Sequence, residues 1–185
     1  MSLKFLIGFV IFFNFFLSVQ ANEKKKIIDY LSQVYNFTFN FEQITNEKIE
    51  TGGCMLVFDN KLKCNYKGKL QKEIIVNKKT LVILQKRYNK IYFYPISKSP
   101  FINILNKNKL LNLIKNSNLV INENIELVYF DENQKKITVF FEKENYELIG
   151  WLVEDKFLNK IYFTLKIEKT NTQIDDENFR IPTEY

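Results

Sequence analysis

The chain has 185 residues, of which 46% are hydrophobic and 16% aromatic, so one domain with a sizeable core can form. It contains no histidine and only two cysteines, which excludes catalysis by imidazole and leaves too few ligands for a zinc site. The formal net charge is +6, and the lysines are spread over turns and loops. This distribution favours a solvated surface over a focused nucleic-acid-binding patch.

The first 21 residues have the composition of a secretory signal peptide. Lys4 precedes an apolar stretch over residues 5–19, and Val19-Gln20-Ala21 matches the small-x-small pattern of a cleavage site. An uncleaved membrane anchor is the alternative, although the stretch is short for a membrane span. We therefore expect cleavage after Ala21 and export of a single mature domain, residues 22–185, to an oxidising compartment.

The segment after this peptide predicts a helix and then a strand. Apolar residues recur at helical spacing from Ile27 to Tyr35 and form one stripe. Phe37, Phe39 and Phe41 then alternate with polar residues, as in a strand with one buried face. Three phenylalanines on one face indicate a thick apolar layer beneath the strand.

Residues 51–94 are typical of an antiparallel meander, because short runs of β-branched and aromatic residues alternate with polar turns. The runs are Met55–Phe58, Leu62–Tyr66, Ile74–Val76, Leu81–Leu84 and Ile91–Tyr94. Gly52-Gly53 precedes a strand and not a helix, which argues against a phosphate-binding loop. The two glycines instead indicate a strand that bends or approaches a neighbour closely.

The two cysteines fall within this meander. A hairpin centred on Asp59 would place Cys54 directly opposite Cys64, with Leu56 facing Leu62. Directly opposed strand residues have β-carbons close enough for a disulfide, and export favours oxidation. Two free, buried thiols are the alternative.

The chain then becomes helical and later returns to sheet. Ser99-Pro100 has the signature of a helix start, and apolar residues at helical spacing follow to residue 116, with a polar break at 106–109. Further strands are predicted at Ile125–Phe130, Ile137–Phe141, Tyr146–Val153 and Ile161–Ile167, and the tail 174–179 is expected to dock one aromatic side chain. These elements predict one α+β domain in which antiparallel strands wrap around helices.

Several segments that should have a solvent face are apolar throughout. Ile74-Ile75-Val76 and residues 81–84 are continuous runs, and the central helices are apolar on more than one side. A thick conventional core would explain this excess. A sheet curled around a hydrophobic hollow, with the helices as its lid, would explain it equally and could hold acyl chains. The acidic residues lie in turn-like contexts and give no indication of a catalytic carboxylate pair.

The order of these motifs resembles the periplasmic lipoprotein carrier family of the LolA type. The resemblance spans nearly the whole mature chain and rests on residues 37–43, Gly53, residues 75–81, residues 94–105 and residues 174–179. The cysteine pair on the second hairpin is similar to that of the alphaproteobacterial variant of the family.

The resemblance implies an incomplete, unclosed antiparallel barrel capped by short helices, without catalytic residues, cofactor or metal. It also implies a periplasmic, monomeric chaperone that binds no nucleic acid. Such a chaperone accepts acylated lipoproteins from an inner-membrane lipoprotein-releasing transporter, buries their acyl chains and passes them to an outer-membrane acceptor. Alternatives are a periplasmic carrier of a phospholipid or glycolipid, a secreted hydrolase, and a partner-binding module with a solid interior.

Candidate cavity residues follow from the predicted elements. We expect the lid to contain Phe101, Ile104, Leu105, Leu111 and Ile114, and the walls to contain Leu56, Leu62, Ile75, Leu81, Ile83, Tyr92 and Tyr94. Because the apolar runs are continuous, alternation does not determine which strand face is concave.

Two positions depart from the family pattern. Members commonly carry Arg-Pro in the turn after the strand that Gly53 opens, and the arginine holds the lid, whereas this chain has Asp59-Asn60. The resemblance therefore leaves the lid's attachment unassigned. Lys78 follows Asn77 where Asn-Gly is usual, so we expect Lys78 to adopt a left-handed backbone conformation.

Overall fold

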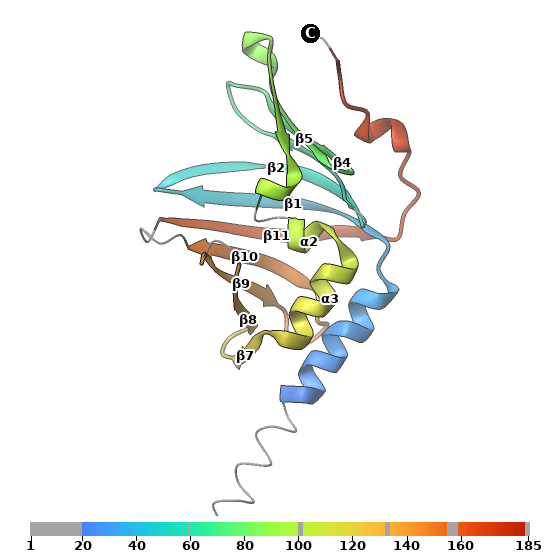
Figure 1. Cartoon of the computed structure of the whole chain (residues 1–185), viewed down its shortest axis with the longest axis vertical. Coiled ribbons are helices and arrows are strands. Elements are labelled where there is room, and N and C mark those ends of the chain that lie inside the picture. Colours follow the sequence, from blue (N-terminus) through green and yellow to red (C-terminus); the bar gives the residue numbers. More distant parts are fainter. Residues whose placement is uncertain (1–19, 59, 100–101, 132–133, 155–158, 184–185) are drawn as a thin grey trace, which may run out of the picture.

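The computed structural model describes residues 20–58, 60–99, 102–131, 134–154 and 159–183. Their strands form one antiparallel sheet that curls around helices lying on its concave side (Figure 1). The strand order is β6-β5-β4-β3-β2-β1-β11-β10-β9-β8-β7, and β6 and β7 do not pair with each other in the described residues. The sheet is therefore not closed into a barrel, which confirms the predicted fold class.

The strands form two meanders of consecutive hairpins. The first contains β1 (Asn36–Thr45), β2 (Lys48–Val57), β3 (Lys61–Tyr66), β4 (Lys72–Asn77), β5 (Thr80–Gln85) and β6 (Lys90–Pro95). The second contains β7 (Asn118–Ile121), β8 (Ile125–Phe130), β9 (Lys136–Phe141), β10 (Leu148–Glu154) and β11 (Lys160–Thr170). Antiparallel pairing of β1 with β11 joins them, from Phe37 opposite Thr170 to Thr45 opposite Ile161.

The helical segments connect or cover these meanders. An N-terminal helix is described over residues 20–33. The others are η1 (Lys86–Tyr88), η2 (Ile96–Lys98), α2 (Ile102–Leu105), α3 (Lys107–Asn116) and η3 (Asp176–Phe179). None of the helices in the described ranges combines the length and apolarity that a membrane span requires.

The boundaries around α3 and β7 differ from the sequence prediction. Residues 106–109 are not a break of four residues, because only Asn106 is non-helical, and its side chain caps α3 by accepting a hydrogen bond from the Lys109 amide. Strand β7 was not predicted. It has four residues, of which only Leu119 is buried, so it is too short to show an alternating pattern.

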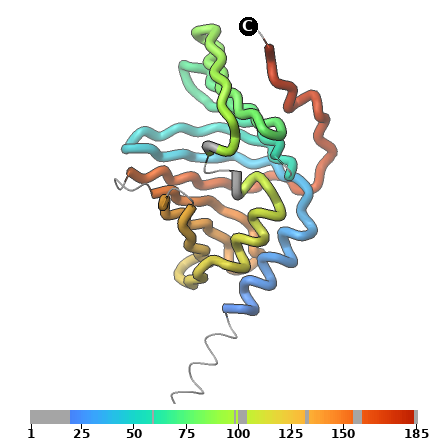
Figure 2. Tube along the Cα trace, viewed as in Figure 1, coloured from blue at the N-terminus to red at the C-terminus, as the bar shows by residue number. Residues whose placement is uncertain are grey.

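The N-terminal helix and α3 lie side by side on the concave face (Figure 2). Lys107 Nζ, in the first turn of α3, donates to the carbonyl oxygens of Ser32 and Val34, each at 2.8 Å. Lys24 Nζ donates to the carbonyl oxygens of Lys115 and Ser117, at 3.1 and 2.7 Å. Each lysine therefore satisfies carbonyl groups at the C-terminal end of the other helix, which fixes the two helices antiparallel.

The predicted in-and-out alternation of β1 is confirmed. Phe37, Phe39 and Phe41 are all buried on the concave face. Phe41 lies opposite Gly52 of β2, and a β-carbon at Gly52 would sit 2.2 Å from the Asn65 carbonyl oxygen and 2.6 Å from the Phe41 ring. Gly52 therefore allows the Phe41 ring to lie across β2.

The two cysteines form a disulfide. Cys54 lies directly opposite Cys64, their Cα atoms are 4.1 Å apart, and Leu56 faces Leu62, as the sequence predicted. Asp59, the predicted centre of this hairpin, lies outside the described residues. Lys78 has a φ of 56°, the left-handed conformation expected for it.

The C-terminal tail runs along the outside of the first meander. Phe179 of η3 is fully buried, as expected of the docked aromatic. The Asn77 side-chain amide donates to the Phe179 carbonyl oxygen at 3.1 Å, and Lys61 pairs with Asp176 at 2.7 Å. These contacts hold the tail against β3 and β4.

Replacing Gly52 with alanine should destabilise the fold by about 2 kcal/mol, because the added methyl group overlaps the Asn65 carbonyl and the Phe41 ring. Gly53→Ala is the matched control, since its β-carbon would meet nothing nearer than 3.5 Å. Urea unfolding of the two variants tests this prediction. Equal stabilities would contradict the close approach at Gly52.

Removing the disulfide with the double substitution Cys54→Ala and Cys64→Ala should lower the free energy of unfolding by about 3 kcal/mol in the chain-entropy model. Chemical denaturation with and without a reducing agent provides the measurement. Reductant should destabilise the natural protein and leave the double variant unchanged. Insensitivity of the natural protein to reductant would mean that the bridge contributes nothing.

Candidate functional site

An apolar cavity of about 170 Å³ lies between the concave face of the sheet and the segment that contains η2 and α2. Strands β1 to β5 supply most of its wall, and β10 and β11 close it from the second meander. Ile96, Ser99, Ile104 and Leu105 cover it. Apolar cavities of about 150 Å³ stay free of water and take up apolar ligands, so the size and lining suit a hydrocarbon guest.

The register of the first meander explains which side chains face the cavity. Leu62 lies opposite Val76, which lies opposite Leu81. Opposed residues of an antiparallel pair project to the same face, so these three side chains form one row across β3, β4 and β5. Cys64, Ile74 and Ile83 form the next row.

Six of the residues expected from the sequence line the cavity. They are Leu56, Leu62, Leu81 and Ile83 in the wall and Ile104 and Leu105 in the cover. The other described candidates do not line the cavity, and Phe101 lies outside the described residues.

Ile75 does not line the cavity, because it projects from the convex face of β4. There it packs in a separate buried cluster with Val82 and Leu84, against which Ile91 and Ile181 are placed. Ile181 belongs to the C-terminal tail, so the tail contributes to covering the outer face. The apolar runs of β4 and β5 are thus continuous because both of their faces are covered.

Tyr92 and Tyr94 lie on the cavity side of the sheet but not in the cavity. They are opposite Ile83 and Leu81, whose side chains do line it. Both tyrosines are exposed, because β6 is the edge strand.

Leu111 and Ile114 of α3 contribute to the core and do not line the hollow. Ile114 is fully buried, and Leu111 is a partly buried side chain that packs against the same cluster. That cluster includes Ile27 of the N-terminal helix and Leu127 of β8. Core side chains therefore fill the space beneath α3, and the hollow is beneath η2 and α2.

Several cavity residues were not among the sequence candidates, notably aromatic side chains. The aromatic residues among them are Phe37, Phe39, Tyr66, Trp151 and Phe163. The alternation in β1 had already marked Phe37 and Phe39 as buried. Trp151 and Phe163 come from the second meander and stack with ring centroids 4.3 Å apart. Their place in the wall depends on the pairing of β1 with β11, for which the sequence carries no local signal.

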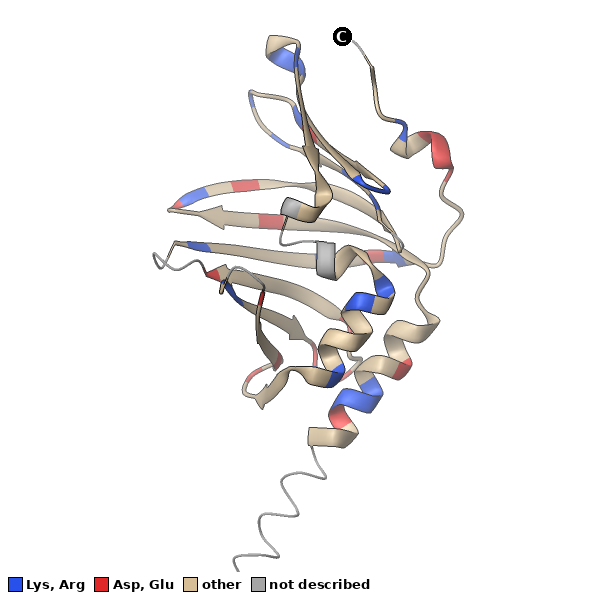
Figure 3. Cartoon of the chain, in the orientation of Figure 1, with Lys and Arg blue, Asp and Glu red and all other residues tan. Residues whose placement is uncertain are grey.

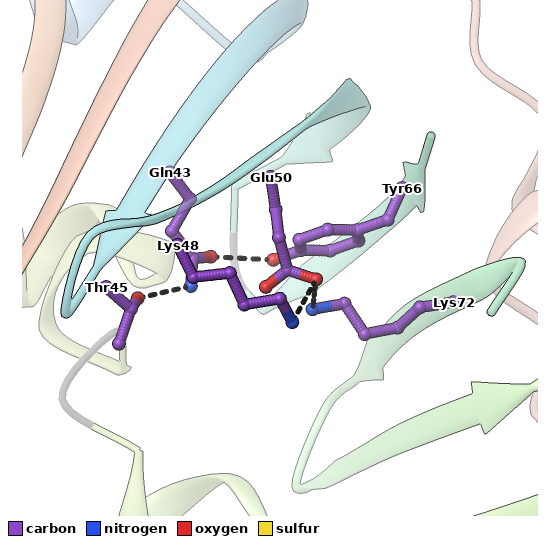
Figure 4. A network of polar contacts seen from close by, with 6 residues as sticks. All are labelled: Gln43, Thr45, Lys48, Glu50, Tyr66 and Lys72. Atoms are coloured by element: carbon purple, nitrogen blue, oxygen red, sulfur yellow. Dashed lines mark hydrogen bonds and ion pairs between the residues drawn. The ribbon is translucent and has the colours of Figure 1, made fainter. Parts of the chain in front are cut away.

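A polar cluster fixes the Tyr66 part of the wall (Figure 4). The Tyr66 hydroxyl donates to Gln43 Oε1 at 2.9 Å, and Lys72 Nζ lies 3.7 Å from the centre of the Tyr66 ring. Glu50 accepts from Lys72 at 2.8 Å and pairs with Lys48 at 3.3 Å. The Tyr66 ring is thereby held in one orientation against the apolar space.

The ionisation of this cluster follows from burial and neighbouring charge. Burial, together with the nearby Glu50 carboxylate, raises the pKa of Tyr66, so its hydroxyl stays protonated. Burial also pushes the pKa of Glu50 upward, but the hydrogen bonds and charges of Lys72 and Lys48 outweigh it and lower the pKa overall. Glu50 therefore remains a carboxylate and neutralises one of the two lysines.

The cover is attached through backbone groups and through Lys107. The Asn60 amide donates to the Leu105 carbonyl oxygen at 3.3 Å, which ties the turn after β2 to the end of α2. Immediately after α2, Lys107 Nζ binds the carbonyl oxygens of Ser32 and Val34. A main-chain contact from the turn and a lysine on the adjacent helix thus hold the cover.

The open antiparallel sheet, the helices inside its curve and the apolar space beneath them define a lid-covered half-barrel, an architecture suited to apolar ligands. Residues 32–182 match the family model described as outer membrane lipoprotein carrier protein LolA. The match covers most of the chain, and the chain belongs to this family. A comparison with curated proteins finds no match.

Solved structures share the fold at low sequence identity. An uncharacterized conserved protein from Thermus thermophilus superposes with a TM-score of 0.54 and 8% identity, over 86% of this chain and 94% of that one. LprF from Mycobacterium bovis gives a TM-score of 0.52 and 12% identity, over 85% and 95%. The Pseudomonas aeruginosa MucA/MucB complex gives 0.50 and 9%, over 88% of this chain and 61% of the other.

Filling the cavity should weaken the uptake of an apolar probe. We expect Ile83→Trp to reduce the affinity for the fluorescent probe N-phenyl-1-naphthylamine by about tenfold or more, because the larger side chain occupies space that the probe needs. Ile49→Trp, at an exposed position of β2, is the matched control and should bind normally. Fluorescence titration measures both affinities, and equal values would show that the probe does not enter this cavity.

Proposed function

We propose that the protein is a periplasmic chaperone that binds the acyl chains of lipoproteins in this cavity and carries them from the inner to the outer membrane. The observation that supports this most directly is an apolar space beneath an attached helical cover in a chain of the lipoprotein carrier family. In this proposal the protein acts by binding and release, as a carrier and not as an enzyme.

The energetics of acyl-chain transfer explain why such a cavity is needed. Each methylene group removed from water contributes about 0.8 kcal/mol, so one long acyl chain contributes on the order of 10 kcal/mol. A lipoprotein therefore does not cross an aqueous compartment at a useful rate without a protein that covers its chains. The apolar rows on β3, β4 and β5 provide that cover.

The cavity in its present state is smaller than its proposed cargo. About 170 Å³ accommodates part of one acyl chain, so loading requires the cover to move away from the sheet. Ile104 and Leu105 occupy space that a guest would take, and they return to it on release. This competition lowers the net affinity for the guest and makes transfer to an acceptor possible.

The proposed location rests on the N-terminal segment. Residues 1–19 lie outside the described part, and we propose that residues 1–21 are a signal peptide and 22–185 the mature domain. Cleavage after Ala21 would leave intact the buried face of the N-terminal helix, which includes Ile27 and Leu31. The Cys54–Cys64 disulfide agrees with an oxidising compartment such as the periplasm.

The partners that this function requires are an inner-membrane lipoprotein-releasing transporter and an outer-membrane acceptor. A carrier of a phospholipid or glycolipid would use the same cavity and is the second candidate. A hydrolase finds no support in the wall, because its described lining residues include no acidic side chain. The presence of the hollow itself argues against a module with a solid interior.

Depletion of the protein in its own bacterium should trap lipoproteins in the inner membrane, because their acyl chains then have no soluble carrier. Separation of inner and outer membranes, followed by detection of acylated proteins, measures the effect. Expression of Ile49→Trp should restore outer-membrane localisation, whereas Ile83→Trp should not. Normal localisation in depleted cells would contradict the proposal, and phospholipid or glycolipid copurifying with the protein would then support the second candidate.

A further inference from the structure

The basic residues of the chain are strongly concentrated in one segment. Residues 60–122 contain 14 lysines and arginines but a single acidic residue, Glu73, and so carry a formal charge of +13. Since the whole chain has a charge of +6, the remaining residues carry −7. The lysines do lie largely in turns and loops, as expected, but the excess of positive charge is concentrated in this segment. The basic segment forms β3 to β6 and the helices α2 and α3, which supply much of the cavity wall and its cover.

Five exposed cations of the first meander lie together at one end of the sheet, in two turns that we call the basic tip, residues 67–71 and 86–90 (Figure 3). Lys78 and Lys79, in the turn between β4 and β5, are exposed at the opposite end. The turns are adjacent, because the amides of Lys86 and Arg87 donate to the carbonyl oxygens of Gln71 and Leu70, at 3.4 and 3.5 Å. Five exposed cations lie in the basic tip, namely Lys67, Lys69, Lys86, Arg87 and Lys90. Such a cluster attracts anionic surfaces.

One acidic residue, Glu73, pairs with a cation of the basic tip. Glu73 is only 5% exposed and forms ion pairs with Lys63 and with Lys86. Lys86 belongs to the basic tip, so this carboxylate offsets part of the charge of the tip, but none of the residues of the basic tip itself is acidic. The tip remains strongly positive at its surface.

Exposed aromatic side chains continue from the basic tip along the edge of the sheet. Tyr88, Tyr92, Phe93 and Tyr94 are 53%, 37%, 54% and 46% exposed, and they represent four of the ten exposed large apolar side chains in the described residues. Three of them lie on the edge strand β6, with Tyr92 and Tyr94 on the concave face and Phe93 on the convex face. We call these four residues the aromatic edge.

We propose that the basic tip and the aromatic edge dock the protein on the surface of an anionic lipid bilayer. Lysine and arginine are attracted to anionic headgroups, and tyrosine and phenylalanine settle at the boundary between headgroups and acyl chains. The charge of the basic segment orients the cavity-bearing half of the molecule toward the membrane. Because Tyr92 and Tyr94 adjoin Ile83 and Leu81 of the cavity wall, docking brings the hollow close to the lipid surface.

A protein partner that adds a strand to β6 is the other occupant that an edge strand could have. Strand addition uses the backbone groups of the edge and does not require exposed aromatic rings on both faces of the strand. β6 also begins at Lys90 and ends at Pro95, residue types that discourage edge-to-edge pairing. The combination of cations and aromatic rings therefore favours a lipid surface.

The proposal is tested by the binding of the purified protein to phosphatidylcholine vesicles prepared with and without phosphatidylglycerol, in a flotation assay. We expect binding only when phosphatidylglycerol is present, and its loss at high salt. The double variants Arg87→Glu with Lys90→Glu, and Phe93→Ser with Tyr94→Ser, should each reduce the partition coefficient by about tenfold or more.

Matched controls separate docking from general effects of charge and hydrophobicity. Lys166→Glu with Lys169→Glu changes the net charge equally on β11, and Phe130→Ser with Tyr162→Ser removes exposed rings on β8 and β11. Both control variants should bind vesicles like the natural protein. All variants should still take up N-phenyl-1-naphthylamine, which establishes that they are folded.

Two outcomes of the vesicle assay would overturn the proposal. One is the absence of binding to phosphatidylglycerol vesicles, and the other is equal loss of binding in the tip, edge and control variants. If the natural protein binds isolated bacterial membranes but not after protease treatment of those membranes, the edge serves a protein partner and the lipid proposal is wrong. Because the vesicles contain no lipoprotein, these results are independent of the carrier function proposed above.

Discussion

The pairing of β1 with β11 is the constraint on which the rest of the structure depends. Each meander is built from local hairpins and has an apolar concave face, but residues of both meanders are needed to line the cavity. Their union brings Phe41 of β1 and Phe163 of β11 into a stack with ring centroids 4.9 Å apart, and Phe163 stacks in turn on Trp151. This aromatic row crosses the pairing of β1 with β11, which we call the seam. The side chains of the cavity wall and those of the packed core therefore form one continuous layer.

The concave face is divided between a filled part and a hollow part. The N-terminal helix and α3 fill one part with aliphatic side chains, and the reciprocal contacts of Lys24 and Lys107 hold the two helices together. The short helix α2 and the turn η2 cover the other part without filling it. The same sheet therefore supplies both the stability of the fold and the space for a guest.

The sequence predicted the local features well, because they follow from short-range patterns. The hairpin that opposes Cys54 and Cys64, the buried face of β1 and the left-handed Lys78 all depend on neighbouring residues. The concave face of β4 and β5 was not predictable, since the tail residue Ile181 contributes to an outer cluster and makes both faces apolar. Ile75 was assigned to the wrong face for this reason. Trp151 and Phe163 were missed because the seam joins residues from the two ends of the chain.

The pairing of β1 with β11 also has a consequence for how the chain folds. The first strand lacks a partner along one of its two edges until the last strand is available, so contacts of very high sequence separation complete the sheet, and topologies of this kind fold slowly. During that interval the phenylalanines of β1 are without their aromatic neighbours on β11. The cavity wall is therefore completed last, because Phe163 of β11 reaches its place only when β11 has paired with β1.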